Sequence, residues 1–155
     1  MRCRTRMHPR DEGAAAVEFA LVLTLFLTLV FGIIQYSFYF FQSQAASSTS
    51  REASRLAAVG VDNCTTWKDS VLAAARANGL GASQVPNGSR ISLTFQDAGS
   101  PPTTSSPTTG GNALVTITWT PTNFTFPFLP FISGNQTVDS QTRVESVGTS
   151  SSATC

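Results

Sequence analysis

Histidine and lysine are nearly absent from this sequence, which holds one of each, His8 and Lys68, and only three cysteines. With the single imidazole at position 8, the rest of the chain has no histidine base to activate a serine or cysteine nucleophile. Histidine-containing metal sites are excluded there for the same reason. Glycine-rich phosphate-binding loops are missing too, because the pair Gly110-Gly111 stands in a stretch of threonine and proline. The sequence therefore predicts that the protein is not an enzyme and that it binds no cofactor.

Charge is also scarce along the chain. Charged residues make up 12% of the 155 positions, against about 25% in typical soluble domains, and the net charge is +1. A nucleic-acid-binding protein would gather an excess of basic residues on one face, so nucleic acid is not an expected partner. Serine and threonine fill 39 of the 155 positions instead. The charge that exists is unevenly placed, because four of the nine arginines fall within residues 1–12.

A long apolar segment follows this basic start. From Phe19 to Phe41 there are 23 consecutive uncharged and mostly apolar residues, preceded by the lone carboxylate of Glu18. As a helix, 23 residues span about 34 Å, enough to cross a hydrocarbon core of about 30 Å. The aromatic residues from Tyr36 to Phe41 are typical of a membrane–water interface. The sequence thus predicts a basic leader over 1–13, a transmembrane helix over 14–41 and an exported domain over 42–155.

The basic residues also set the expected orientation. Four arginines precede the apolar segment and the first one beyond it is Arg51, which places residues 1–12 in the cytoplasm and residues 42–155 outside. A buried helix of a soluble protein is one alternative, but the rest of the chain has too few apolar residues to surround it. A cleaved secretory signal ending at Ser43-Gln44-Ala45 is another, but its apolar region would far exceed the usual length of about 7–15 residues.

The start of the apolar segment carries a motif. Residues 13–19, with the sequence GAAAVEF, follow a short basic leader and precede a long apolar run, and they resemble a type IV prepilin processing signal. Roughly residues 12–60, including the Ala-rich end Ser50–Ala58 with its two arginines, resemble the TadE-like family of minor pilins, or pseudopilins, of the Flp (tight-adherence) pilus. The apolar run lacks the proline of many relatives, and Gln42 and Gln44 stand where relatives carry an arginine.

The resemblance implies cleavage after Gly13 by a membrane-embedded prepilin peptidase, with Ala14 as the new N-terminus and Glu18 and Phe19 as part of the signal. Gly13 has no side chain to obstruct a protease, and the small residues 14–16 allow an extended backbone to approach closely. Cleavage would create an α-ammonium four residues before Glu18, and in an assembly that cation can pair with Glu18 of a neighbouring subunit. The alternative is a solvated Glu18 at the level of the lipid headgroups.

Small residues recur at every fourth position of the apolar segment. In lipid, where apolar contact alone brings little advantage, such residues let helices approach closely. Four residues rotate a helix by about 400°, so the stripe winds around the helix and favours a crossing or bundled partner. Chance is the alternative, since these residue types are common in membrane spans. The predicted helix-packing residues are Ala16, Ala20, Thr24, Thr28 and Gly32.

Two helices are expected in or next to the exported segment. The first runs without a break from about Ala14 to Ala58, because no proline or glycine interrupts residues 42–58, and Gly60 ends it. A second helix is predicted at 66–78, beginning at Thr66 in a capping-box arrangement with Asp69 and closed by a glycine at position 79.

Strands are expected in the remainder. Strict alternation of apolar residues predicts strands at 91–95 and 115–120, and a third strand is expected at 137–147. The apolar stretch 124–131 holds two prolines and is predicted to be a loop that caps the sheet or exposes a contact patch. The predicted fold is α+β and pilin-like, with a three-stranded antiparallel sheet packed on the long helix. The apolar faces of the first two strands are Ile91, Leu93 and Phe95, and Val115, Ile117 and Trp119.

Cys64 and Cys155 both lie on the side of the membrane where disulfides persist, whereas Cys3 is in the leader. A bridge between them would close a large loop and stabilise the domain by about 4–5 kcal/mol in the chain-entropy picture. Free thiols or intermolecular bridges are the alternatives.

These observations lead to one expected function and one alternative. The expected function is that of a TadE-like minor pilin in Flp (Tad) type IV pilus assembly, seated by one span in the cytoplasmic membrane of a bacterium. Its expected partners are the membrane, a prepilin peptidase and other pilin or Tad assembly subunits. The alternative is an unprocessed single-pass membrane protein whose extracellular domain binds a ligand or partner.

Overall fold

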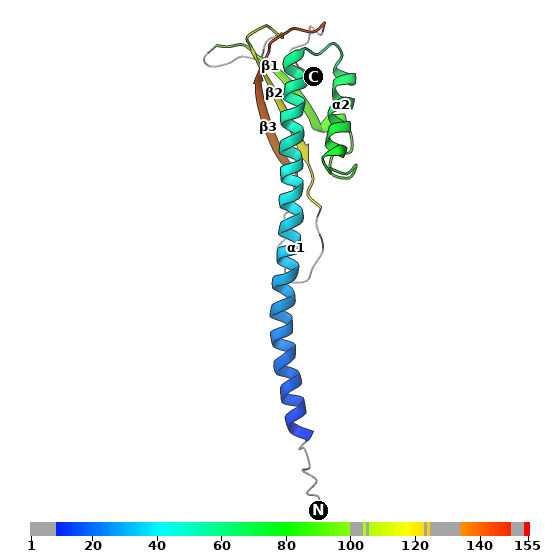
Figure 1. Cartoon of the computed structure of the whole chain (residues 1–155), viewed down its shortest axis with the longest axis vertical. Coiled ribbons are helices and arrows are strands. Elements are labelled where there is room, and N and C mark those ends of the chain that lie inside the picture. The colour runs from blue at the N-terminus through cyan, green and yellow to red at the C-terminus, as the bar shows by residue number, and fades with distance from the viewer. Residues whose placement is uncertain (1–8, 100–103, 105, 123, 125–133, 150–153) are drawn as a thin grey trace, which may run out of the picture.

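The computed structural model describes residues 9–99, 104, 106–122, 124, 134–149 and 154–155. Figure 1 shows the N-terminal half of one long helix as a bare stalk and the other elements gathered around its C-terminal half. This confirms the expected α+β fold, with a long N-terminal helix, a second helix and a small antiparallel sheet. The elements are α1 (Pro9–Val59), α2 (Cys64–Ala77), the 3-10 turn η1 (Gly88–Arg90), β1 (Ile91–Gln96), β2 (Asn112–Trp119) and β3 (Gln136–Arg143).

Helix α1 begins at Pro9, five residues before the expected start at Ala14. Proline is well suited to the first turn of a helix, because the backbone N–H that it lacks would have no partner there. Because α1 already includes Pro9, Gly13 lies inside the helix and does not interrupt it. The helix ends at Val59, where Gly60 takes a φ of 114° and donates its N–H to the carbonyl of Ala57 at 3.3 Å.

Helix α2 begins two residues earlier than expected. Its N-cap is Asn63, whose side-chain oxygen accepts hydrogen bonds from the backbone N–H groups of Thr65 at 2.8 Å and Thr66 at 3.4 Å. The prediction of Thr66 as the capping residue, paired with Asp69, was wrong. Asparagine is the stronger capping residue, and a start at residue 64 lets one amide oxygen serve two otherwise unpaired donors.

The end of α2 follows the expected glycine closure. Gly79 has a φ of 96°, its N–H donates to Arg76 at 3.1 Å, and the N–H of Leu80 donates to Ala75 at 2.9 Å. This pair of bonds is a Schellman motif, which satisfies the last carbonyls of a helix and turns the chain away from it. It also brings Leu80 back into the core, where it is 1% exposed.

The sheet is a simple meander in the order β1-β2-β3, antiparallel throughout. Ile91 pairs with Ile117 at one end of the first ladder, and Trp119 pairs with Gln136 in the second. The buried faces of β1 and β2 are those that alternation predicted. Strand β3 ends at Arg143, short of the expected Val147; Val144 still exchanges backbone hydrogen bonds with Gly110 and Gly111, each at 2.8 Å, before the chain turns to the end of α1.

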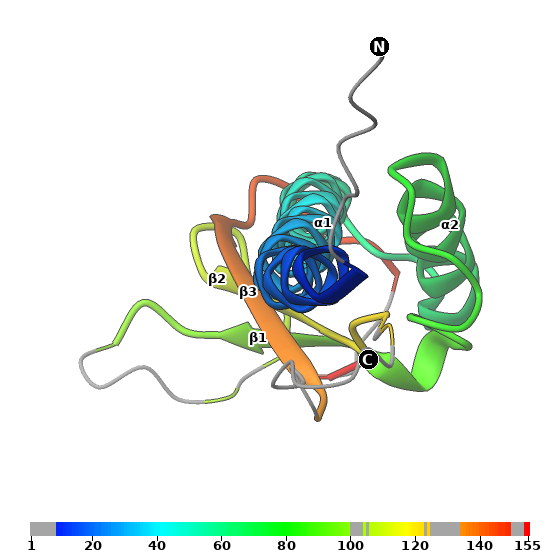
Figure 2. The ribbon, with the colours of Figure 1, turned by 90° about the horizontal axis from the view of Figure 1, so that it is seen from below.

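Helix α1 lies between the sheet and α2, as the view along the helix shows (Figure 2). Its buried face in this region is made of small side chains, which allow both layers to approach the helix axis. Where α1 meets the edge strand β3, the contact is polar: the hydroxyl oxygens of Ser54 and Ser140 are 3.1 Å apart. The small residues of this buried face are Ala45, Ala46, Thr49, Ser50, Ala53, Ser54 and Ala57.

Two contacts close the domain at the end far from the stalk. After β3, the N–H groups of Glu145 and Ser146 both donate to the carbonyl of Ala58, at 2.9 and 3.2 Å. The C-terminal residue Cys155 donates its N–H to Leu93 of β1 at 2.8 Å, and its sulfur is bonded to that of Cys64. The disulfide therefore ties the last residue of the chain to the first turn of α2.

Candidate functional site

The N-terminal half of α1 is an apolar surface without a cover. Within the described part of the chain, this is the one helix long and apolar enough to cross a membrane, and none of its most apolar stretch is buried. Leu21 is 70% exposed and Leu25 is 73% exposed. A continuous apolar surface of this extent marks a site of contact with lipid or with other protein.

The residues expected at the processing site lie near the start of this surface. Gly13, Ala14, Glu18 and Phe19 are all in α1, and nothing lies within 4 Å of where a side chain on Gly13 would begin. Ala14 and Glu18 are four residues apart and so share a face of the helix. The backbone at Gly13 is helical and not extended, so a peptidase would have to unwind the first turns of α1. Gly13 lowers the stability of helix at the point where unwinding is needed.

Glu18 is the single charged residue between Gly13 and Arg51. It is exposed, and among the side chains that the structure describes it has no ion-pair partner. A carboxylate so close to an apolar surface is costly to bring into lipid unless a cation meets it. The site can therefore accept a positively charged group from another molecule.

The predicted packing stripe of Ala16, Ala20, Thr24, Thr28 and Gly32 lies on this helix, and its two hydroxyls are bonded within it. Thr24 donates to the carbonyl of Ala20 and Thr28 to that of Thr24, each at 2.8 Å. With the hydroxyl groups satisfied in this way, the stripe presents methyl groups and needs no polar partner. A neighbouring helix could pack on it without leaving a donor unpaired.

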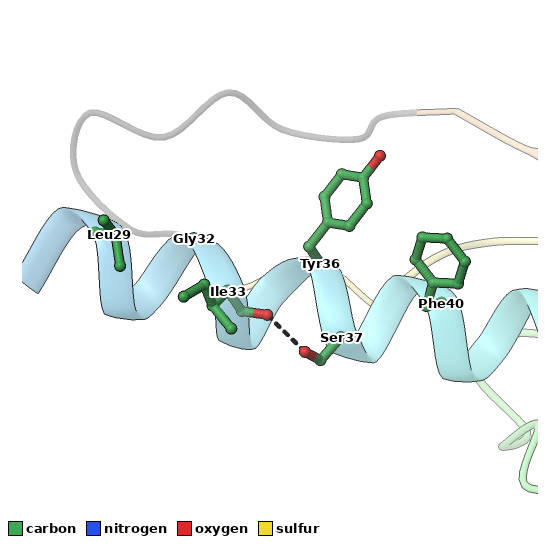
Figure 3. A pocket seen from close by; sticks show the side chains of 6 residues that line it. All are labelled: Leu29, Gly32, Ile33, Tyr36, Ser37 and Phe40. Atoms are coloured by element: carbon green, nitrogen blue, oxygen red, sulfur yellow. Dashed lines mark hydrogen bonds between the residues drawn. The ribbon is translucent and has the colours of Figure 1, made fainter.

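The last residue of the stripe, Gly32, lines a shallow hollow on the surface of α1 (Figure 3). Gly32 leaves bare backbone between larger side chains, and the hydroxyl of Ser37 is turned back to the carbonyl of Ile33 at 2.7 Å. The hollow is open and mostly apolar, and so fits an apolar side chain from outside. Its lining residues are Leu29, Gly32, Ile33, Tyr36, Ser37 and Phe40.

Above the hollow, aromatic residues of α1 meet the folded domain. The ring centroids of Phe38 and Phe124 are 5.1 Å apart, and those of Tyr39 and Trp119 are 5.8 Å apart. Phe41 packs against Gly79, where a side-chain carbon would come within 2.7 Å of its ring. These aromatic residues, expected to face lipid at the membrane interface, also hold the base of the domain. Of the apolar stretch 124–131, only Phe124 is among the described residues.

A polar cluster lies next to these rings. The side chain of Gln42 donates to the hydroxyl of Thr122 at 2.8 Å and accepts the backbone N–H of Thr122 at 3.0 Å. The side-chain amide of Gln84 donates to the same hydroxyl at 2.6 Å, and the backbone carbonyl of Gln84 accepts the N–H of Thr120 at 3.1 Å. Gln42 is 4% exposed, and its side-chain amide holds the chain after β2 against α1.

Residues 13–55 match the family model described as TadE-like protein. This segment is similar to TadE-like proteins. The resemblance that the sequence indicated is thereby confirmed over α1 from Gly13 to Arg55, while α2 and the sheet lie outside the match. No curated protein and no solved structure matches the chain.

Within the TadE-like segment, sequence reasoning missed the role of Gln42. It identified this residue only as a departure from the family pattern, but the structure makes it the link between α1 and the chain after β2. A glutamine in an otherwise apolar region was the available signal, because a polar side chain there needs a partner. The position of that partner, 80 residues further along the chain, had no signal in the sequence.

Proposed function

We propose that this protein is a minor pilin-like subunit that takes part in the assembly of a Tad pilus. In this proposal α1 anchors it in the cytoplasmic membrane of a bacterium, with the N-terminus inside and the folded domain outside. The observation that carries the proposal is that the TadE-like match, residues 13–55, includes the whole exposed apolar stretch of α1 and continues along the same helix into the folded domain. The family match therefore includes the exposed apolar surface together with the small buried residues of α1 that pack on the domain.

Processing after Gly13 by a prepilin peptidase is the second element of the proposal. Supporting it are the exposure of Gly13, the small residues that follow it and the position of Glu18 one helical turn after Ala14. Cleavage would remove the leader with its four arginines and place an α-ammonium at the start of the helix.

Assembly with neighbouring subunits is the third element. The new α-ammonium of one subunit would pair with Glu18 of the next and set the axial offset between helices. The stripe and the Gly32 hollow supply an apolar surface on which a helix of a Tad subunit can pack. The role is structural, and no catalytic step is assigned to the protein.

Mass spectrometry of the N-terminus, on protein extracted from membranes of its native host, tests the processing step. A mature chain that starts at Ala14 supports the proposal. An intact Met1 would favour the alternative of an unprocessed single-pass membrane protein, and a start near Ala46 would indicate a cleaved secretory signal.

The variants Glu18→Ala and Glu18→Gln test the assembly step. Both should be cleaved normally but should lose piliation, because each leaves the neighbour's α-ammonium without a counter-charge. Glu52→Ala is the matched control, since Glu52 is an exposed carboxylate of the same helix within the folded domain. Normal pili in either Glu18 variant would remove the charge pair from the proposal.

A further inference from the structure

Aromatic side chains from two distant parts of the chain meet around α1 at the base of the folded domain. Phe38, Tyr39 and Phe41 come from α1, whereas Trp119 ends β2 and Phe124 follows it. We call these five residues the aromatic collar. The pairs Phe38–Phe124 and Tyr39–Trp119 are in ring contact at 5.1 and 5.8 Å. The collar is therefore built from residues of the folded domain as well as from residues of α1.

The height of the collar follows from helix geometry. Twenty residues separate Glu18 from Phe38, and a rise of 1.5 Å per residue places these two levels about 30 Å apart. That is the thickness of a hydrocarbon core. If Glu18 marks the inner boundary of the membrane, Phe38 reaches the outer one. Phe124, in contact with Phe38, lies at the same level.

The collar and its neighbours are apolar on the side of the stalk and polar on the side of the domain, as expected at a membrane–water interface. Phe41 is 57% exposed, and just beside it Tyr36 and Phe40 stack on each other at 5.7 Å while remaining more than half exposed. One turn further toward the domain, Gln42 and Thr122 form the polar cluster described above. Apolar rings on one side and bonded amides on the other match the environment at the headgroup level, where aromatic residues concentrate.

We infer that the base of the exported domain is a lipid-contacting surface, on which the domain rests against the outer leaflet of the membrane. The exposed rings of the aromatic collar, Phe38 and Phe41 above all, are the contact; Phe124 lies against Phe38, and Trp119 is buried behind Tyr39. This inference rests on the membrane anchoring given under Proposed function. It adds that the domain is seated at a fixed height: α1 is unbroken through residues 35–45, and Gln42 bonds the segment after β2 to it.

The two tryptophans of the chain make the inference measurable. Trp119 belongs to the collar, whereas Trp67 lines a hollow with Leu56 and Gly60 at the far end of α1. Leu56 stands 17 residues beyond Tyr39, which corresponds to about 26 Å along the helix. Trp119 is 2% exposed and packs beneath Tyr39, so it is expected just behind the lipid-contacting rings, and Trp67 is expected well above them.

The experiment uses four full-length proteins with a single tryptophan each, reconstituted into phosphatidylcholine vesicles with and without bromine on the lipid chains. Trp67→Phe keeps Trp119, and Trp119→Phe keeps Trp67. In a background that carries both changes, Phe124→Trp probes the second collar position and Phe26→Trp probes the centre of the stalk. Loss of tryptophan emission in brominated vesicles reports proximity to the lipid chains.

We expect strong loss of emission for Phe26→Trp, clear loss for Phe124→Trp with bromine placed near the headgroup end, a smaller loss for the buried Trp119, and none for Trp67. Loss at Phe26→Trp together with collar tryptophans that behave like Trp67 would overturn the inference and leave the anchoring intact. No loss at Phe26→Trp would instead overturn the anchoring itself. Because Trp119 is probed without altering any collar residue, misfolding of the Phe124 variant cannot decide the result alone.

Discussion

The side-chain amide of Gln42 holds the backbone and the hydroxyl of Thr122, 80 residues away, at 3.0 and 2.8 Å. Gln42 is buried in α1, and Thr122 follows β2. A paired amide of this kind fixes both the distance and the rotation of one segment relative to the other. It joins the TadE-like helix to the part of the domain that lies outside the family match.

Replacing Gln42 by leucine should destabilise the domain by about 1–3 kcal/mol, because the N–H of Thr122 would lose its partner in a partly buried place. Gln44→Leu is the control, since Gln44 is exposed two residues further along the same helix. Urea unfolding of the detergent-solubilised proteins, followed by tryptophan emission, measures both. Equal unfolding midpoints for the two variants would show that the Gln42–Thr122 contact contributes nothing to stability.

Loss of the disulfide should have a larger effect. Cys64 and Cys155 are 91 residues apart, and closing a loop of that length stabilises a fold by about 4–5 kcal/mol in the chain-entropy model. We expect Cys64→Ser, Cys155→Ser and the double variant to lose the same amount, because each abolishes the same bond. Cys3→Ser should change nothing. A reductant should lower the melting temperature of the unaltered protein and leave that of the double variant unchanged; any other pattern contradicts an intramolecular bridge.

Gly148 lies against the backbone of Val61, just after the end of α1. A side-chain carbon at this position would come within 2.6 Å of the carbonyl of Val61, so Gly148→Ala must push two backbone segments apart. Overpacking of this kind typically costs about 1–3 kcal/mol. Gly88→Ala is the comparison, because its nearest neighbour is the flexible side chain of Lys68 at 3.3 Å. The same urea titration should separate the two variants, and similar stabilities would contradict the tight approach at Gly148.

Local patterns in the sequence were sufficient for most of the fold. Alternation identified the buried faces of β1 and β2, because a half-buried strand leaves a period of two in its sequence. The start of α2 was misplaced because two competing capping residues, Asn63 and Thr66, stand three positions apart. The end of β3 was misplaced because Val144, which is buried and still exchanges backbone hydrogen bonds with Gly110 and Gly111, continues the alternation past the last residue of the strand.

The aromatic collar could be predicted only in part. The aromatic composition of residues 36–41 predicted a membrane interface, because composition can be read from a single stretch of sequence. Their contacts with Trp119, Phe124 and Gly79 join positions far apart in the chain, and such contacts leave no periodic trace in a single sequence. The same holds for the candidate site: the stripe was visible as a spacing, but the hollow at Gly32 depends on how the surrounding side chains are placed.

The hollow at Gly32 yields the sharpest test of assembly. Gly32→Leu would fill it from within and keep a neighbouring helix from approaching, at a cost of about 1–3 kcal/mol, or roughly 5- to 150-fold weaker association. Ile34→Phe is the control, because two residues rotate the helix by about 200° and place the added bulk on the opposite side. Pili counted by electron microscopy and copurification with Tad subunits should both fall for Gly32→Leu alone. The hollow reaches Phe40, level with the contacts of Phe38 and Tyr39 with the domain, so an unchanged unfolding midpoint is the control that assigns a loss of pili to association. If Gly32→Leu assembles as well as Ile34→Phe, the hollow is a lipid-facing surface and the packing face lies elsewhere on α1.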